Sequence, residues 1–238
     1  ITHVPFNDVA ALEAAVSDKT CAVIIEPIQG ESGILPATQE YLQAARRLCD
    51  KHGALLILDE VQTGMGHTGK LFAYGHYGVT PDILSSAKAL GSGFPIGAIL
   101  TTDKIAPTFG PGTHGSTFGG NPMACAVGSR AFDIINAPET LAHVKQQGQK
   151  LQTALREIGE KTGVFKEVRG MGLLLGCVLA DKYAGKASEI TATALKHGLM
   201  VLVAGANVVR FAPSLLLNDE DMAEGLKRFE AALAEWLA

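Results

Sequence analysis

Residues 54–60 read ALLILDE, a continuous apolar run that ends in two acidic residues. Five apolar residues in a row, without polar alternation, are typical of a strand buried on both faces of a parallel sheet. Gly53 stands directly before the run, where it would end a preceding helix. The stretch therefore predicts a buried strand that carries a carboxylate, Asp59, at its carboxyl end.

Amphipathic stretches and short apolar runs alternate on both sides of residues 54–60. Strands that alternate with helices indicate an α/β fold with a mostly parallel sheet. Ligands of such sheets bind at the carboxyl ends of the strands, where Asp59 and Lys88 are expected. The predicted helices span about 8–17 and 38–52, and Thr38 is expected to cap the second of them. The predicted strands span about 22–26, 82–86 and 96–101.

The pattern changes from about Phe132, where a long polar helical stretch is followed by alternating strands. We therefore expect a large domain over residues 1–131 and a smaller C-terminal α+β domain over residues 132–238. In the smaller domain, helices are predicted at about 139–161, 188–197 and 220–237, and strands within 165–179, 201–203 and 208–211.

The composition narrows the classes of partner. The 238 residues carry a net charge of −4, so there is no basic surface of the kind that binds nucleic acid. No apolar run approaches the roughly 20 residues that span a bilayer, and no membrane partner is expected. The four cysteines form no CxxC pair, and no metal site is predicted. Their apolar neighbours suggest buried reduced thiols and a cytoplasmic protein.

Three segments hold residues suited to catalysis. Asp59 at a strand end is either a turn residue or a carboxylate held against a cationic ligand. Lys88 follows the predicted strand 82–86, among small and apolar residues. It is either a surface lysine whose stem covers apolar neighbours or a buried amine with a lowered pKa that attacks carbonyls. Residues 114–122, HGSTFGGNP, form either a plain turn or a loop that offers Ser116 and Thr117 to a phosphate.

Together the three segments suit one cofactor. Pyridoxal phosphate has an aldehyde for the lysine, a ring nitrogen for the acid and a phosphate for the hydroxyl loop. Residues 64–69, GMGHTG, also fit the GxGxxG pattern of dinucleotide-binding proteins. Gly75, Gly78 and Pro81 interrupt the stretch where the required long helix would run, so we do not expect a nicotinamide site.

The motifs resemble those of class III (ω-) aminotransferases, which depend on pyridoxal phosphate. The likeness covers essentially the whole chain, and residues 200–214, MVLVAGANVVRFAPS, are similar to the acetylornithine and succinylornithine aminotransferases. It implies the fold type I of pyridoxal-phosphate transferases, a homodimer with shared active sites, and a role in arginine metabolism. The other matching segments are EPIQGE at 26–31, LDEVQTGMG at 58–66, SAKALG at 86–91 and GSTFGGNP at 115–122.

The resemblance assigns roles at the cofactor. Lys88 would bind it covalently and then carry the proton between substrate and cofactor carbons. Asp59 would keep the pyridine nitrogen protonated, Val61 would pack on the ring, and Gln62 would bond its phenolic oxygen. Thr117 would reach the phosphate of the neighbouring subunit's cofactor.

It also assigns roles at the substrate. Ser116 would lie close to it, and Arg210 would hold the α-carboxylate of 2-oxoglutarate. Glu31 would pair with Arg210 while the amine donor is bound. The implied reaction moves the terminal amino group of N2-acetyl- or N2-succinyl-ornithine to 2-oxoglutarate. The alternatives are another ω-transaminase, for ornithine or 4-aminobutyrate, and a non-catalytic relative, against which the intact Lys88 and Asp59 argue.

Some positions depart from the family's pattern. His67 stands where the family more often has arginine, and Ser92 where it usually has glycine. The chain begins ITHVPFND, without an initiator Met, and lacks the family's N-terminal part. We expect this chain alone to be an incomplete enzyme. The natural protein should carry well over a hundred further N-terminal residues, present in the same chain or as a separate one.

Overall fold

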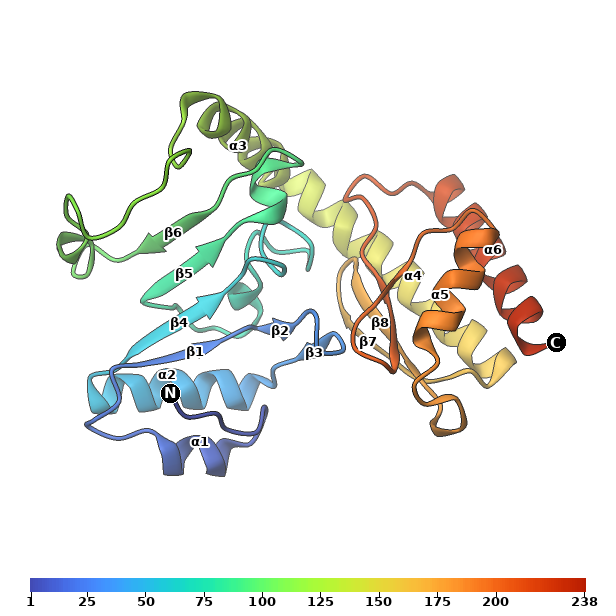
Figure 1. Ribbon diagram of the computed structural model, residues 1–238, viewed down its shortest axis with the longest axis horizontal. Coiled ribbons are helices and arrows are strands. Elements are labelled where there is room, and N and C mark those ends of the chain that lie inside the picture. The colour runs from blue at the N-terminus through green and yellow to red at the C-terminus, as the bar shows by residue number, and fades with distance from the viewer. The chain divides into compact units, whose positions relative to one another are not determined.

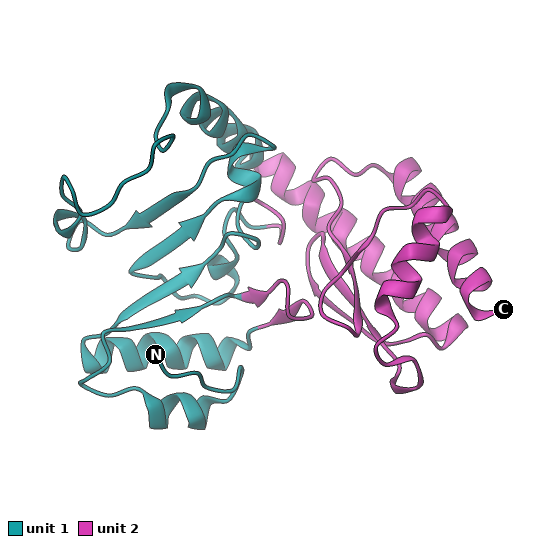
Figure 2. Cartoon of the chain, viewed as in Figure 1, with its two compact units in different colours: residues 1–27, 37–65, 70–137 teal, residues 28–36, 66–69, 138–238 magenta.

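The computed structural model describes residues 1–238, which form two compact units (Figure 2). The first comprises residues 1–27, 37–65 and 70–137, and the second residues 28–36, 66–69 and 138–238. The expected boundary at 131/132 falls inside a helix, α3 (Pro122–Ile135), and the chain divides after Ala137 instead. Residues 28–36 join the second unit because Ile28 and Ile34 are buried in its apolar cluster.

The sheet of the first unit has four strands: β1 (Ala22–Ile25), β4 (Leu55–Asp59), β5 (Ile83–Ser86) and β6 (Ala98–Thr101). Their order is β1-β4-β5-β6, with the first three parallel and β6 antiparallel (Figure 1). The predicted α/β fold with a mostly parallel sheet is confirmed. β6 runs against β5 because only a short connection, without a crossover helix, joins them. β1 pairs on one side only, and the side chain of Ile24 is 70% exposed.

Two helices, α1 (Val9–Ala15) and α2 (Gln39–His52), lie beside the β1–β4 end of this sheet (Figure 1). The backbone N–H of Tyr41 donates to Oγ1 of Thr38 at 3.1 Å, and Gly53 ends α2 in the left-handed conformation. Both helix ends were predicted from these residue types and are confirmed. The apolar face of α2 is buried and comprises Tyr41, Leu42, Ala44, Ala45 and Cys49.

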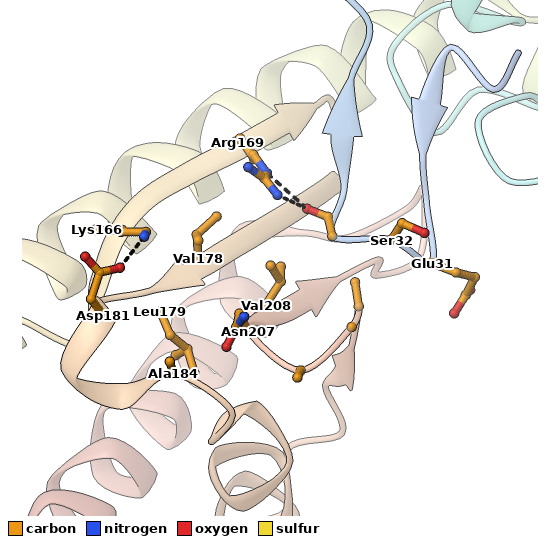
Figure 3. A pocket seen from close by; sticks show the side chains of 14 residues that line it. Glu31, Ser32, Lys166, Arg169, Val178, Leu179, Asp181, Ala184, Asn207 and Val208 are labelled. Carbon is orange, nitrogen blue, oxygen red and sulfur yellow. Dashed lines mark hydrogen bonds and ion pairs between the residues drawn. The ribbon is translucent and has the colours of Figure 1, made fainter. Parts of the chain in front are cut away.

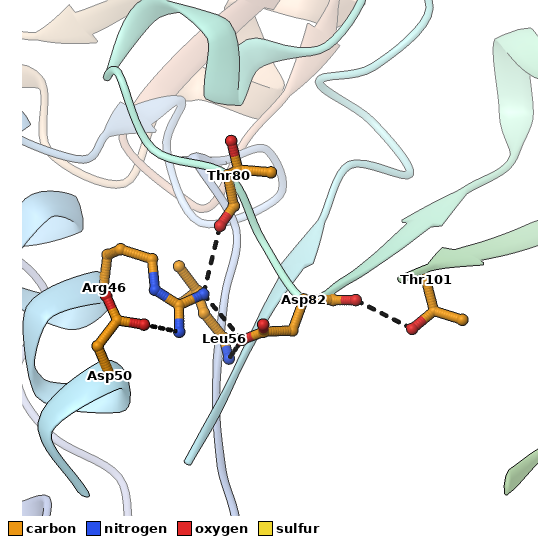
Figure 4. Close-up of polar contacts among 6 residues, drawn as sticks. All are labelled: Arg46, Asp50, Leu56, Thr80, Asp82 and Thr101. Carbon is orange, nitrogen blue, oxygen red and sulfur yellow. Dashed lines mark hydrogen bonds and ion pairs between the residues drawn. The ribbon is translucent and has the colours of Figure 1, made fainter. Parts of the chain in front are cut away.

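An ion-pair network fixes the start of β5 (Figure 4). Nη1 of Arg46, on α2, lies 2.8 Å from Oδ2 of Asp82, and its Nη2 lies 2.8 Å from Oδ1 of Asp50. Asp82 also accepts the backbone N–H of Leu56 at 2.7 Å, and its carbonyl accepts the hydroxyl of Thr101. The Asp82 side chain thus links helix α2 and strand β4 to the beginning of β5. It thereby fixes the position of β5 and of the residues that follow it.

The segment after β4 is held by a buried acid. Glu60 is 0% exposed, and its carboxylate accepts the Thr63 hydroxyl at 2.6 Å and the backbone N–H groups of Ala73 and Tyr74 at 2.8 and 2.7 Å. These bonds hold Glu60 against Thr63 and against the start of the short 3₁₀ helix η1 (Ala73–His76). Burial raises the pKa of Glu60, while the three hydrogen bonds oppose that shift.

Replacing Glu60 with glutamine is expected to lower the free energy of unfolding by roughly 2–3 kcal/mol, because an amide N–H₂ would face donors that now bond a carboxylate. Urea unfolding measures this, with the exposed Glu13→Gln as the control. An unchanged stability would contradict the role given to Glu60.

The same pair of variants tests how the free energy of unfolding depends on pH. Because its folded pKa is raised, Glu60 binds its proton more tightly in the folded state. The part of the stability that depends on protonation of Glu60 is therefore fully present below the ordinary pKa of 4.5 and is lost as the pH rises through the raised value. Glu60→Gln should remove this decrease of stability with rising pH, and Glu13→Gln should keep it.

The rest of the first unit is dominated by turns. The hydroxyl-rich segment between β6 and α3 contains one short 3₁₀ helix, η3 (Ala106–Thr108), and the side chain of Asn121 caps α3 by accepting the N–H of Ala124. Another 3₁₀ helix, η2 (Lys88–Gly91), follows β5 and contacts α3.

The second unit is an antiparallel sheet covered by helices, the α+β arrangement predicted for this part of the chain. The strand order is β7-β8-β10-β9, and a two-stranded hairpin, β2–β3, packs with it through Ile28 and Ile34. The main core includes Phe229 and Leu155, which are fully buried. The elements are β2 (Ile28–Gln29), β3 (Leu35–Pro36), α4 (Pro138–Thr162), β7 (Phe165–Met171), β8 (Leu174–Leu179), η4 (Asp181–Tyr183), α5 (Ala187–Lys196), β9 (Leu202–Val203), β10 (Val208–Phe211) and α6 (Asp219–Leu237).

The expectation of four buried cysteines is half wrong. Cys49 and Cys177 are buried free thiols, and burial raises the pKa of Cys49 to about 11. Cys21 and Cys125 are exposed, because Cys21 precedes β1 and Cys125 lies on an outward face of α3. Among the helices, none combines the length and apolar character needed to cross a membrane.

Candidate active site

The Asp59 carboxylate ends β4 and is oriented by two hydrogen bonds. Its Oδ1 accepts the backbone N–H of Val61 at 3.0 Å and the hydroxyl of Ser85 at 3.0 Å. Asp59 and Ser85 are direct neighbours in the parallel pairing of β4 and β5. Both bonds go to one oxygen, so Oδ2 remains available to accept a further N–H. This half-buried carboxylate is set to bind a cationic donor.

Lys88 lies three residues beyond Ser85, at the first position of η2. Its side chain is exposed and forms no hydrogen bond or ion pair within the chain, so of the two alternatives left open by the sequence the structure has the surface lysine rather than the buried amine. The neighbours Ala87 and Ala89 are too short to cover the amine. The backbone of Lys88 has φ +48°, an uncommon value for a residue with a Cβ and the kind of strain that gathers at functional sites.

Ser92, four residues on, has φ +44° and ends η2 in the left-handed conformation. Glycine adopts this conformation without the steric cost of a Cβ. The glycine that the resemblance leads us to expect here would form this turn without strain, and Ser92 retains the turn at some cost.

The remaining predicted cofactor residues are in turns. Val61 and Gln62 are half-buried and directly follow the buried Glu60. Ser116 and Thr117 lie in a fully exposed stretch, 111–120, where Oγ of Ser116 accepts the N–H of Gly119 at 2.9 Å. The hydroxyl of Thr117 has no partner in its own chain. The structure thus joins Asp59, Val61 and Ser85 by hydrogen bonds, and it forms none between Ser116 or Thr117 and these residues.

The second unit contains the other predicted pair. Nη1 of Arg210, on β10, lies 2.6 Å from Oε1 of Glu31 and donates to the carbonyl of Gly30 at 3.3 Å. Arg210 is only 9% exposed, and its Nε has no hydrogen-bond partner. Glu31, by contrast, is exposed. A buried guanidinium with an unused donor suits a planar anion such as a carboxylate.

Ser85 is a site residue that the sequence reasoning missed. Its hydroxyl bonds Asp59 from the adjacent strand. Because side chains alternate along a strand, the parallel register of β4 and β5 could have placed Ser85 on the same face as Asp59.

The GxGxxG segment at 64–69 forms turns, and no long helix follows it. This agrees with the rejection of a dinucleotide site. No group of three or more His, Cys, Asp or Glu side chains is placed to hold a metal ion.

Comparison with known families gives the decisive observation. The model of the family "Aminotransferase class-III" matches residues 2–233. The chain belongs to the class-III aminotransferases. The resemblance read from the motifs is confirmed, and so is the expected fold type I.

Relatives of this class-III aminotransferase cover its full length. The acetylornithine aminotransferase of Neisseria meningitidis serogroup B is 80% identical over 238 residues, which are 100% of this chain and 60% of that protein. The succinylornithine transaminase/acetylornithine aminotransferase of Pseudomonas aeruginosa is 59% identical over 99% of this chain and 58% of that protein. The chain thus spans about 60% of the length of the curated relatives that it matches.

Solved structures agree with the class-III aminotransferase fold. N-acetylornithine aminotransferase from Stenotrophomonas maltophilia has a TM-score of 0.92 at 46% identity, covering 99% of this chain and 62% of that one. Ornithine aminotransferase from Toxoplasma gondii has a TM-score of 0.91 at 34% identity, covering 98% of this chain and 56% of that one.

Proposed function

We propose that the protein is a pyridoxal-phosphate-dependent aminotransferase that moves the terminal amino group of N2-acetyl- or N2-succinyl-ornithine to 2-oxoglutarate. The products are the corresponding semialdehyde and glutamate. The arrangement at the ends of β4 and β5 carries this proposal, because it sets an oriented carboxylate, Asp59, beside the strand that leads to an unpaired amine, Lys88. The substrate rests on the relatives named for acetylornithine and succinylornithine.

The residues present fit pyridoxal phosphate. Oδ2 of Asp59 is available to accept the N–H of the pyridinium ring, and the amine of Lys88 is available for the covalent bond. Val61 would pack on the ring and Gln62 would bond its phenolic oxygen. When bound, the cofactor supplies an electron sink that stabilises negative charge on the substrate carbon.

The remaining roles in the reaction belong to residues of this chain. Asp59 would hold the proton on the ring nitrogen, because an ionised carboxylate favours the protonated form of its partner. Lys88 carries a proton as general base and then general acid. Ser85 and the N–H of Val61 keep the Asp59 carboxylate in one orientation.

Arg210 and Glu31 would serve the two substrates in turn. Arg210 would bind the α-carboxylate of 2-oxoglutarate or glutamate, in the bidentate manner typical of arginine. While the acylated amine donor is bound, Glu31 would neutralise Arg210. The 2.6 Å ion pair between their side chains supports this second state.

Transamination assays with four amine donors and 2-oxoglutarate test the proposed function. We expect acetyl- or succinyl-ornithine to have a kcat/KM at least about tenfold above that of ornithine and of 4-aminobutyrate. A preference for either of the last two would contradict the proposed substrate. The absence of any transfer would contradict the enzymatic role.

We further propose a cytoplasmic homodimer with shared active sites, in which the exposed Thr117 hydroxyl serves the partner's cofactor phosphate. Mixing inactive Lys88→Ala and Thr117→Asp subunits tests it. If Thr117 acts across the interface, a hybrid dimer has one intact site, and mixing should restore about half of the wild-type activity at full hybrid formation. If Thr117 acts within its own subunit, mixing restores nothing.

A further inference from the structure

Arg169 holds the loop that carries Glu31. From β7, its Nε and Nη2 donate to the carbonyl oxygen of Gly33 at 3.0 and 2.8 Å. Figure 3 draws these two bonds as dashed lines from the Arg169 side chain. Its Nη1 makes a longer contact, 3.3 Å, with Glu167. Two donors on one acceptor fix both the position and the orientation of that carbonyl.

A second arginine holds the other end of the same loop. Arg210 donates to the carbonyl of Gly30, as described above. Arg169 and Arg210 both lie opposite Gly176 of β8, in the antiparallel pairings of β7 and β10 with that strand. Residues directly opposite in a sheet project to the same face. The two arginines therefore stand in one row, separated by a residue without a side chain.

The space above Gly176 is filled by Ile34 of the loop and by Val208 of β10. A Cβ at Gly176 would lie 2.9 Å from Cβ of Ile34, a distance too short for two carbon atoms. Ile34 is fully buried there and has φ +50°. A β-branched residue in this conformation is strained, and such strain persists only where the surroundings hold the backbone.

We propose that Arg169 is a positioning residue for the Glu31–Arg210 pair. It acts by holding the Gly30–Ile34 loop on the sheet, so that the exposed Glu31 side chain stays within reach of Arg210. This inference rests on the proposed function of that pair. Without Arg169 the carbonyl of Gly33 loses both side-chain donors. The loop is then held by Arg210 and by the packing of Ile28 and Ile34, and the Glu31 side chain is held less firmly beside the Arg210 guanidinium.

Single-turnover measurements on the complete protein test this, because they separate the two half-reactions. Arg169→Gln should lower kcat/KM for N2-acetylornithine by about tenfold or more. It should leave the half-reaction with glutamate within about twofold, since glutamate uses Arg210 without Glu31. Arg169→Lys should have a kcat/KM for N2-acetylornithine between that of Arg169→Gln and that of the wild type, because an ammonium is a single point donor. Gly176→Ala adds a Cβ that would press on Ile34 and on Val208. It should shift the ratio of the two half-reactions, N2-acetylornithine over glutamate, in the same direction.

Two controls separate positioning from general stability. Lys166→Gln removes a charge from the same strand, where Lys166 pairs with Asp181, and should leave the ratio unchanged. In a Glu31→Gln background, Arg169→Gln should cause no further change in the ratio, because both act through Glu31.

The outcomes are distinct. A Glu31→Gln variant with an unchanged ratio would overturn the proposed function of the pair. If Glu31→Gln shifts the ratio but Arg169→Gln and Gly176→Ala do not, only the positioning inference fails. It also fails if Arg169→Gln slows both half-reactions equally.

Discussion

Replacing Lys88 with alanine is expected to reduce amino transfer by about 10⁴-fold while leaving cofactor binding in place. The loss is large because one amine provides both the covalent attachment and the proton carrier. The exposed amine, free of hydrogen bonds and ion pairs, is already available for both tasks. Steady-state kcat and the absorbance of bound cofactor measure the two effects separately.

The matched control is Lys104→Ala, another exposed lysine of the same unit, which should retain wild-type activity. Borohydride reduction followed by peptide mapping provides a readout independent of turnover. It should place the pyridoxyl group on Lys88. A label on any other lysine, or a Lys88→Ala enzyme with normal turnover, would refute the assignment.

Asp59→Asn is expected to lower kcat by about 10²- to 10³-fold, the range seen when one oriented electrostatic group is removed. The substitution is nearly isosteric. The amide oxygen can still accept the N–H of Val61 and the hydroxyl of Ser85, so the local structure should survive. What is lost is the negative charge that keeps the ring nitrogen protonated.

Asp103→Asn, at an exposed position beyond β6, serves as the control and should leave kcat unchanged. Circular dichroism and thermal unfolding should be the same for both variants and the wild type. An Asp59→Asn enzyme that transaminates at the wild-type rate would show that the carboxylate has another role.

The sequence determined the local elements and the chemistry of the site. The apolar run at 54–58 predicted a strand, which the structure has as β4, although only one face of β4 is fully buried and the other is half-buried. Thr38 and Gly53 marked the two ends of α2, and the motifs around Asp59 and Lys88 identified the family. These features depend on near neighbours in the chain, such as hydrogen bonds over two to four residues and the period of side-chain burial. They can therefore be read from one sequence.

Other features depend on contacts between residues far apart in the chain, and only the tertiary structure decided them. The side chain of Ser85 reaches Asp59 across 26 positions, and Arg169 reaches Gly33 across 136. The same long-range packing transfers residues 28–36 to the second unit, where Ile34 fills the space above Gly176. Strand register and burial fix these contacts, and both are set by the folded chain as a whole, so no local pattern predicts them.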